Sequence, residues 1–430
     1  MALTGRAAAA AAIGALVVLA VRTGAALLAV NAVILAAIIA DLMLAASVRP
    51  LRLVRAGDAR IRLGEAGTVT LTLGNPGRRP LRALVRDAWP PSAAATPGRA
   101  QVSVAPGGSA SLTTTLRPTR RGDRSPGPVT VRSFGPLGLA ARQASRQVPW
   151  SVRVLPPFAS RRHLPEKLAR LRQLDGQQRA LLPGQGSEFD SLREYVVGDD
   201  VRSIDWRSSA RRVDVLVRTW RPERDRHIVV VLDTGRTAAA RVSGAPRLDT
   251  SMDATLLLTA LASRAGDRVD LIAVDRRIRA RVVGASRSAV LSAFTSALAV
   301  LDAELIESDA DLIAGGVLSI ARQRSLVVLL TDLNAAAVED GLLPRVPLLA
   351  ARHQLLVAAV ADPHLDKMAA GRGSAAAVYA AAAAEQARAE RARTAALLRR
   401  HGVVVVDAPP DRLPAALADA YLRLKARGRL

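Results

Sequence analysis

Residues 184–233 read GQGSEFDSLREYVVGDDVRSIDWRSSARRVDVLVRTWRPERDRHIVVVLD. Acids and arginines lie at short, irregular spacing around the aromatic residues Phe189, Tyr195 and Trp206. This density indicates charge-assisted hydrogen bonds in which arginine side chains bind carboxylates. The closing run, HIVVVLD at 227–233, is typical of a strand buried on both faces of a sheet. We therefore expect an α/β domain to follow this segment.

The segment also resembles the signature of the domain of unknown function 58 family, a bacterial group with a domain similar to the von Willebrand factor type A fold. The residues that carry this resemblance are Glu188, Phe189, Asp190, Leu192, Arg193, Tyr195, Gly198, Asp199, Asp200, Arg202, Ile204, Asp205, Trp206, Ser209, Ala210 and Arg211. Members of this family are usually found with MoxR-type AAA+ ATPases. The resemblance therefore implies a chaperone-like or complex-assembly role beside such an ATPase. A weaker match includes Pro136–Leu139, where Gly135 stands in place of the acid expected before the proline.

The chain after residue 226 alternates apolar runs with helical patterns. The runs predict strands at 227–233, 268–275, 325–332, 354–362 and 402–407, with a short extra strand near 279–283. Helices are predicted near 249–265, 286–301, 308–322, 342–352, 374–400 and 411–427. This order predicts a doubly wound parallel α/β domain over 226–430.

Each of the five main strands ends in an aspartate, and ligands of open α/β sheets bind beyond such carboxyl ends. We expect Asp233, Thr237 and Asp332 to converge as a degenerate oxygen site, empty or holding Mg²⁺ weakly. The von Willebrand type A pattern would place a hydroxyl where Gly235 stands and a later threonine, for which Ser308 is a candidate. We expect Arg236 to pair with one of the two aspartates in place of a cation. The plainer alternative is that an aspartate at a strand end only caps the following helix, and we adopt this interpretation for Asp275, Asp362 and Asp407.

Two interpretations of the signature segment remain open. In the first, Arg202, Asp205 and Arg211 belong to a structural network with Trp206 packed beneath it. In the second, the segment is a docking surface for a partner protein. The residues concerned in both are Glu188, Phe189, Asp190, Arg193, Tyr195, Gly198, Asp199, Asp200, Arg202, Asp205, Trp206 and Arg211.

The chain begins with two apolar runs, 7–21 and 25–46, separated by Arg22-Thr23-Gly24. The second is long enough to cross a membrane, so residues 1–48 predict a transmembrane helical hairpin. A signal peptide over residues 1–25 is the alternative. Asp41 is expected at the membrane interface. Arg49, Arg52 and Arg55 follow, which predicts a two-pass membrane protein with its main domains in the cytoplasm.

Residues 49–155 show short alternating runs separated by Pro- and Gly-rich turns, which predict a basic β-sandwich. Residues 156–225 form a connector that holds one amphipathic helix and the signature segment. The fold class is therefore multi-domain, with a helical hairpin, a β-sandwich and an α/β domain.

The net charge is +24, and residues 49–224 hold 32 Arg and Lys against 14 Asp and Glu. Beside a membrane segment, this charge favours an anionic membrane surface over nucleic acid. The chain has no Cys, no phosphate-binding glycine loop and no nucleophile elbow, which disfavours an enzyme. The sequence predicts a membrane-anchored interaction protein with an unknown client. The alternatives are a metal-dependent hydrolase and a nucleic-acid-binding membrane protein.

Overall fold

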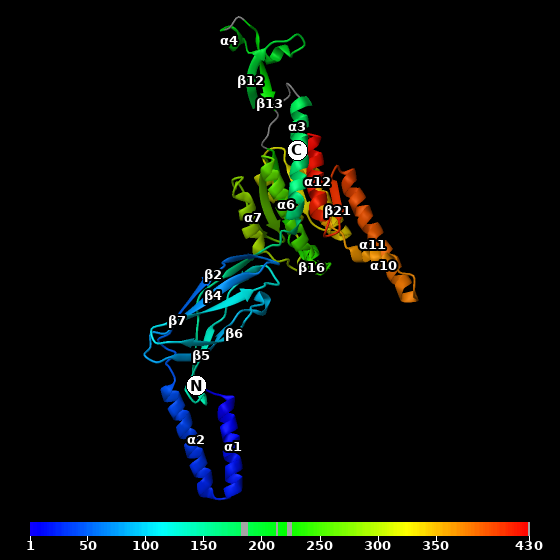
Figure 1. Cartoon of the computed structure of the whole chain (residues 1–430). Coiled ribbons are helices and arrows are strands. Elements are labelled where there is room, and N and C mark those ends of the chain that lie inside the picture. The colour runs from blue at the N-terminus through cyan, green and yellow to red at the C-terminus, as the bar shows by residue number, and fades with distance from the viewer. Residues whose placement is uncertain (182–187, 212–213, 222–225, 429–430) are drawn as a thin grey trace. The chain divides into compact units, whose positions relative to one another are not determined.

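A computed structural model describes residues 1–181, 188–211, 214–221 and 226–428 of the chain (Figure 1). The side chains of 175–181, 188–190 and 219–221 lie outside this description, so the predicted roles of Glu188, Phe189 and Asp190 lie outside it as well. The chain forms two compact units, Met1–Leu155 and Pro156–Leu430.

Two apolar helices, α1 (Gly5–Val21) and α2 (Gly24–Leu44), begin the first unit. They pack against each other where Gly14 lets Val30 and Ile34 approach its backbone. Within the described residues, α2 alone is long and apolar enough to cross a membrane, and α1 is a shorter apolar helix. The length of α2, 21 residues, matches the thickness of a bilayer core.

Asp41, near the end of α2, is fully buried. Its carboxylate accepts backbone N–H groups from Leu137, Leu139 and Ala140 at 2.7–2.9 Å. A side chain at position 135 would collide with this carboxylate, so Gly135 is required there. The acid expected at position 135 is thus absent because Asp41 reaches into this loop from the helix. Asp41 joins the apolar helices to the β-rich part of the unit.

The β-rich part is built from three sheets. Their orders are β1-β10-β9-β5-β6, β2-β4-β7 and β3-β11-β8. The strands are β1 (Ala2–Leu3), β2 (Arg52–Gly57), β3 (Arg60–Arg62), β4 (Gly67–Gly74), β5 (Leu81–Asp87), β6 (Arg99–Val104), β7 (Ser109–Leu116), β8 (Gly122–Arg124), β9 (Val129–Phe134), β10 (Ala140–Arg146) and β11 (Val152–Leu155). Alternate residues of β4, such as Leu71 and Leu73, share one core with Leu81 of β5 and Val131 of β9. The period-two pattern therefore produces two sheets packed face to face.

Arg55 corrects one expectation about the membrane flank. Its side chain is buried and pairs with the buried carboxylate of Asp87, which also accepts the indole N–H of Trp89 at 3.0 Å. Arg55 also donates to the carbonyl of Val148. Of the three arginines that follow α2, Arg49 and Arg52 remain exposed, whereas Arg55 does not.

Asp87→Ala should leave the guanidinium of Arg55 buried without its carboxylate. We expect the β-rich unit to lose about 3–5 kcal/mol of unfolding free energy, the usual cost of removing one partner of a buried pair. Hydrogen exchange of the β5 and β9 amides in the full chain measures this loss. The control, Asp123→Asn, removes an exposed pair with Arg153 and should cost less than about 1 kcal/mol. Equal costs for the two variants would contradict the assignment.

The second unit contains a six-stranded sheet in the order β18-β17-β14-β19-β20-β21. The strands are β14 (His227–Asp233), β17 (Arg268–Val274), β18 (Ile278–Val282), β19 (Leu326–Leu330), β20 (Gln354–Val360) and β21 (Val404–Ala408). The five main strands are parallel, as predicted, and the short extra strand β18 is antiparallel at the edge. The order reverses between β14 and β19, which creates the switch point of a doubly wound sheet.

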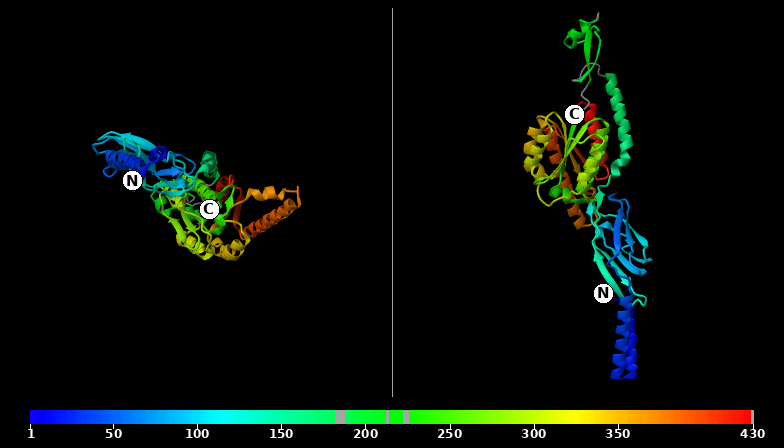
Figure 2. Two further views of the ribbon diagram at one scale, coloured as in Figure 1. Left: turned by 90° about the horizontal axis from the view of Figure 1, so that it is seen from below. Right: turned by 90° about the vertical axis from the view of Figure 1, so that its left-hand side faces the viewer.

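Helices cover both faces of this sheet (Figure 2). One face packs against α6 (Arg247–Arg264), α7 (Val290–Ala299) and α12 (Leu413–Ala426), and α3 (Leu164–Leu181) packs on α6 and α12. The other packs against α8 (Ala310–Ile320), α9 (Val346–Ala350) and α11 (Ala375–Arg400). Two short helices, α5 (Arg236–Ala239) and α10 (Pro363–Ala369), follow β14 and β20. Successive residues of β14 alternate between the two cores, which explains its unbroken apolar sequence.

Candidate functional site

A pocket of about 300 Å³ opens at the carboxyl end of the sheet beside Asp233. Asp233 ends β14, the strand at the switch point. The pocket is lined by Asp233, Arg236, Thr237, Glu307, Ser308, Ala310, Ile313, Leu329, Thr331, Ala336, Ala337, Val338, Asp340, Gly341 and Leu342. Doubly wound sheets bind their ligands at this place, so we take the pocket as the first candidate site.

Four donors saturate the buried carboxylate of Asp233. One oxygen accepts the backbone N–H of Gly235 at 2.8 Å and the hydroxyl of Ser308. The other accepts the hydroxyls of Thr237 at 3.2 Å and Thr331 at 2.5 Å. A side chain at position 235 would collide with the Ser308 hydroxyl, so this serine fills the space above Gly235. The hydroxyl missing from the sequence pattern at Gly235 is thus supplied by a residue 73 positions later.

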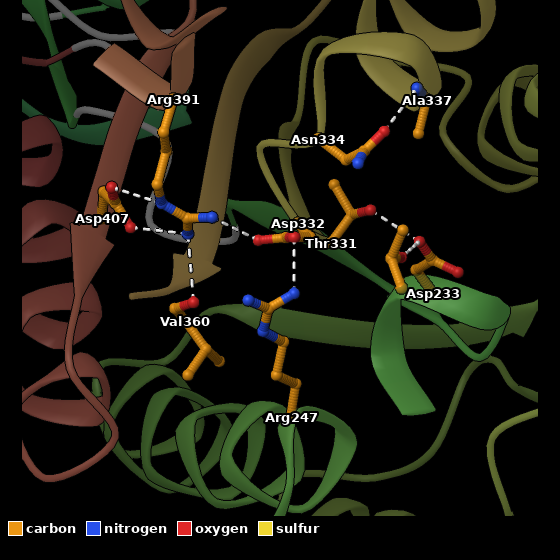
Figure 3. A network of polar contacts seen from close by, with 10 residues as sticks. Asp233, Arg247, Thr331, Asp332, Asn334, Ala337, Val360, Arg391 and Asp407 are labelled. Atoms are coloured by element: carbon orange, nitrogen blue, oxygen red, sulfur yellow. Dashed lines mark hydrogen bonds and ion pairs between the residues drawn. The ribbon is translucent and has the colours of Figure 1, made fainter. Parts of the chain in front are cut away.

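Asp332 does not join this group, which corrects the expected convergence of Asp233, Thr237 and Asp332. Its two oxygens accept hydrogen bonds from Arg247 and Arg391, each at 2.5 Å (Figure 3). Adjacent residues at the end of a strand point to opposite faces, so Thr331 reaches Asp233 while Asp332 points away. The signal for Thr331 in the sequence is its place directly before Asp332, at the end of a predicted strand.

Arg236 does not pair with either aspartate, contrary to expectation. Its guanidinium binds Glu307 at 2.9 Å, and both side chains are exposed. The charge of Asp332 is balanced instead by Arg247 at the start of α6 and Arg391 in α11. Two arginines from other helices thus pair with Asp332 in place of Arg236.

The arginine cluster, which we define as Arg247, Asp332, Arg391 and Asp407, ties strand ends together. Arg391 binds Asp407 through two hydrogen bonds of 2.8 Å and donates to the carbonyl of Val360 at 3.0 Å. Burial disfavours the charge of Arg391, but its hydrogen bonds and its attraction to Asp407 and Asp332 outweigh burial. The pKa of Arg391 therefore lies above the ordinary arginine value. One side chain of α11 thus holds the carboxyl ends of β19, β20 and β21.

Arg391→Met should leave two acids with fewer partners and loosen these three strand ends. We expect the α/β unit to lose about 3 kcal/mol of unfolding free energy, measured by urea unfolding of the full chain. The matched control on the same helix, Arg388→Met, removes exposed pairs and should cost less than about 1 kcal/mol. A cost for Arg391→Met no larger than that of the control would refute a stabilising role for the cluster.

The residues around Asp233 suit a divalent cation only in part. Asp233 and the hydroxyls of Thr237, Ser308 and Thr331 are hard oxygen donors of the kind that Mg²⁺ accepts. Yet, in the described chain, Asp233 is the one carboxylate bonded to these hydroxyls, and its four donors already satisfy it. Glu307 and Asp340 also line the pocket, but Glu307 is paired with Arg236. Across the described residues, no three acids or histidines are grouped as metal ligands. The donor set therefore fits weak binding at most.

Titration of the full chain with Mg²⁺ by calorimetry should accordingly show no saturable micromolar binding. We expect any affinity to be about millimolar, as in the weakest oxygen sites. Asp233→Asn should remove whatever binding exists. Micromolar binding that Asp233→Asn abolishes would show that the hydroxyls turn to coordinate a cation.

The signature segment forms a two-stranded antiparallel hairpin of β12 (Glu188–Glu194) and β13 (Leu216–Arg221). Arg193 binds Asp199 through two hydrogen bonds of 2.8 and 2.6 Å, and Asp199 also accepts the N–H of Val196 at 3.0 Å. The hydrogen bond from Arg193 lowers the pKa of Asp199. Gly198 has a φ of 112°, a conformation that favours glycine. These contacts define the turn after β12.

A second ion pair orders the segment between the strands. Asp205 caps the short helix α4 (Trp206–Ser209) by accepting the N–H of Ser208 at 2.9 Å, and it binds Arg218 of β13 at 2.8 Å. These bonds lower the pKa of Asp205, the first making the larger contribution. Asp200 accepts the N–H of Arg202 at the start of a short 3₁₀ turn, Val201–Ser203.

The predicted ion pairs of Asp205 with Arg202 and Arg211 do not form in the described part of the segment, and Asp205 binds another arginine. Among the described residues, Arg202 and Arg211 form no ion pair, and Asp205 binds Arg218. Trp206 is 66% exposed and does not pack beneath a network. The arginine-to-acid pairs run between the strands and their own turn, because a two-stranded hairpin offers no interior in which to bury an indole.

A serine–histidine–aspartate series that the sequence analysis missed lies at the amino ends of the strands. His227 is 2.7 Å from Asp270 and 3.2 Å from the hydroxyl of Ser325. Ser325 is buried, and its hydroxyl donates to the carbonyl of Gln323 at 2.8 Å. A nucleophile must be accessible and must donate its proton to the base. The series therefore connects three strand starts and lacks the geometry for catalysis.

Comparison with known proteins places the match in the second unit. The model of the family described as "Protein of unknown function DUF58" matches residues 191–406. The uncharacterized protein Rv1480 of Mycobacterium tuberculosis is 30% identical over 109 residues, which cover 25% of this chain and 34% of that protein. An uncharacterized Mycobacterium bovis protein matches to the same extent. The matched region thus spans about a third of the length of these curated relatives.

Solved structures resemble parts of the chain only distantly. Proximal thread matrix protein 1 from the mussel byssus shares 13% identity and a TM-score of 0.28 over 47% of each chain. The CARDB domain of a Pyrococcus furiosus protein shares 14% identity and a TM-score of 0.19, covering 26% of this chain and 91% of that one. Neither similarity is high enough to support a function.

Proposed function

The chain belongs to the family of proteins of unknown function DUF58, whose model matches half of its length, and we propose that it is a membrane-anchored protein–protein interaction module. In this proposal it has no catalytic activity of its own. It acts with a MoxR-type AAA+ ATPase in complex assembly or chaperone-like maturation of a client. The ATPase is the partner that the family resemblance implies.

The exposed apolar surface of the signature hairpin is the observation that carries this proposal. Val197 is 94% exposed, Trp206 is 66% exposed, and Val196 and Val201 are each 61% exposed. Soluble proteins rarely leave several large apolar side chains together in water unless a partner covers them. Tryptophan is also the residue type most enriched among side chains that dominate binding energy. We name this set, Val196, Val197, Val201 and Trp206, the hairpin surface.

The frame around the hairpin surface suits a docking role. Arg193–Asp199 and Asp205–Arg218 order the turn and the capped helix, so the apolar side chains are presented with little loss of freedom on binding. These two ion pairs are sufficient to order the segment without Trp206. Because Trp206 is not packed in the interior, its exposure favours the docking interpretation.

The anchor in this proposal is the pair of apolar helices. Helix α2 supports one membrane crossing by its length and composition, and α1 would supply the second. Exposed Arg49 and Arg52 follow α2, and such positive flanks favour the cytoplasmic side. The β-rich and α/β units would then lie in the cytoplasm, where an ATPase can reach the hairpin surface.

A von Willebrand type A-like role of the Asp233 pocket is a second part of the proposal. The pocket lies at the switch point of the sheet, where that fold would bind partners, and the Asp233 carboxylate in it accepts hydrogen bonds from three hydroxyls. Because the carboxylate is satisfied without a cation, we propose that partner binding does not require one. Binding to the ATPase should therefore survive EDTA.

Trp206→Ala combined with Val197→Ser should weaken binding of the full chain to the MoxR-type ATPase of the same organism. We expect a loss of about 2 kcal/mol or more in binding free energy, the scale of a dominant interface residue. Surface plasmon resonance on the detergent-purified chain measures it. The melting temperature should not change, because neither side chain is buried.

The matched control is Tyr379→Ala, which removes an exposed aromatic residue from α11 and should leave the affinity unchanged. Unaltered affinity in the Trp206/Val197 variant would contradict docking through the hairpin surface. Salt-sensitive binding to DNA, with no binding to the ATPase, would favour the nucleic-acid alternative.

A further inference from the structure

A second pocket lies within the first unit, where α2 ends against strand β10. Its volume is about 440 Å³, and it is lined by Met1, Ile39, Leu42, Met43, Ser47, Val48, Arg49, Arg142 and Gln143. The Asp41 carboxylate holds α2 against the loop before β10, so both walls belong to one bonded assembly. The hydrogen bonds of Asp41 therefore fix the position of the two walls of the pocket relative to each other.

One wall of this pocket is apolar and continues the surface of α2. Ile39 and Met43 are largely exposed, and Leu42 lies between them on the last turns of the helix. If α2 crosses a membrane, these side chains lie at the level where acyl chains meet headgroups. This wall suits the upper part of a lipid chain.

The other wall is cationic. Arg49 is exposed, and in the described part of the chain its side chain forms no ion pair. Arg142 donates one hydrogen bond, from Nε to the carbonyl of Leu42 at 2.9 Å, so its two terminal amino groups remain available as donors. The lining contains no Asp or Glu. Two guanidinium groups without an acid form a site for phosphate, which arginine binds through paired hydrogen bonds.

The carboxyl end of a helix is electrostatically unfavourable for an anion, because its free carbonyls point outward. Here, arginines already bind the carbonyls of the last turn. Arg142 binds that of Leu42, and Arg79 binds that of Met43. A third arginine, Arg146, donates to the carbonyls of Arg49 and Leu51 just beyond the helix. Two carbonyls in the last turn of α2 thus have arginine partners, which weakens the repulsion between this helix end and an anion.

We propose that this pocket binds one anionic glycerophospholipid. Its phosphodiester would lie between Arg49 and Arg142, and an acyl chain would lie along Ile39, Leu42 and Met43. The inference rests on the proposed membrane anchoring and goes beyond it, since a general attraction between basic residues and anionic membranes needs no pocket. A bound lipid would join the end of the membrane helix to β10 and orient the β-rich unit at the membrane.

The test is a lipid titration of the full chain in detergent, read by native mass spectrometry. Phosphatidylglycerol should bind with one-to-one stoichiometry and more tightly than phosphatidylcholine. Arg49→Gln should weaken phosphatidylglycerol binding about tenfold, since each charge-assisted hydrogen bond to phosphate is worth roughly that factor. Arg49→Gln with Arg142→Gln should weaken it further. Arg99→Gln removes an exposed arginine of β6 outside the pocket and should leave the affinity unchanged.

Arg49→Gln is the decisive variant, because only the backbone of Arg49 takes part in the fold, through its carbonyl. Equal affinities of the Arg49 and Arg99 variants, or equal binding of both lipids, would overturn the proposal. Displacement of the lipid by inorganic phosphate alone would also overturn it, because it would show a phosphate site without a lipid component. Membrane fractionation separates the two proposals: a soluble wild-type chain would contradict anchoring, whereas a membrane-bound chain that does not discriminate lipids would contradict the pocket.

Discussion

The end of strand β19 is the point on which the α/β unit depends. Two adjacent residues there face opposite sides, so Thr331 completes the donors around Asp233 while Asp332 enters the arginine cluster. Arg391 then binds Asp407 and the carbonyl of Val360 as well, and it joins three strand ends to α11. None of the four residues of the arginine cluster lines the Asp233 pocket. A cation at Asp332 would have to displace two arginines, which explains why the aspartates divide their roles.

In the first unit, too, buried carboxylates join separate elements through hydrogen bonds. Asp41 joins α2 to the loop before β10 through three backbone N–H groups, and Asp87 holds Arg55 in the interior of the sandwich. A buried carboxylate is costly unless its oxygens are all bonded, and in both places they are bonded. In a chain with a net charge of +24, the few acids in the core act as connectors between elements.

The signature hairpin differs from these buried clusters. Its ion pairs are partly exposed and order only the turn and the cap of α4, and a two-stranded hairpin has marginal stability by itself. Its large apolar side chains remain in water, at the expense of stability in the isolated chain. This balance is the reason for the docking role that we propose for the segment.

The sequence by itself determined the local elements of this protein. Unbroken apolar runs predicted all five parallel strands of the second unit, and alternating runs predicted the β-rich part, because burial on two faces or one imposes these periods. The switch point between β14 and β19 followed from the usual strand order, and Asp233 was placed there from sequence.

Only the tertiary structure decided which side chains meet. Ser308 binds Asp233 across 75 residues of sequence, and Arg391 binds Asp332 across 59. Asp41 binds backbone N–H groups of a loop that lies 96 to 99 residues later in the sequence. Hydrogen-bond partners depend on which chain segments come together in space, and a local pattern of residue types carries no record of that.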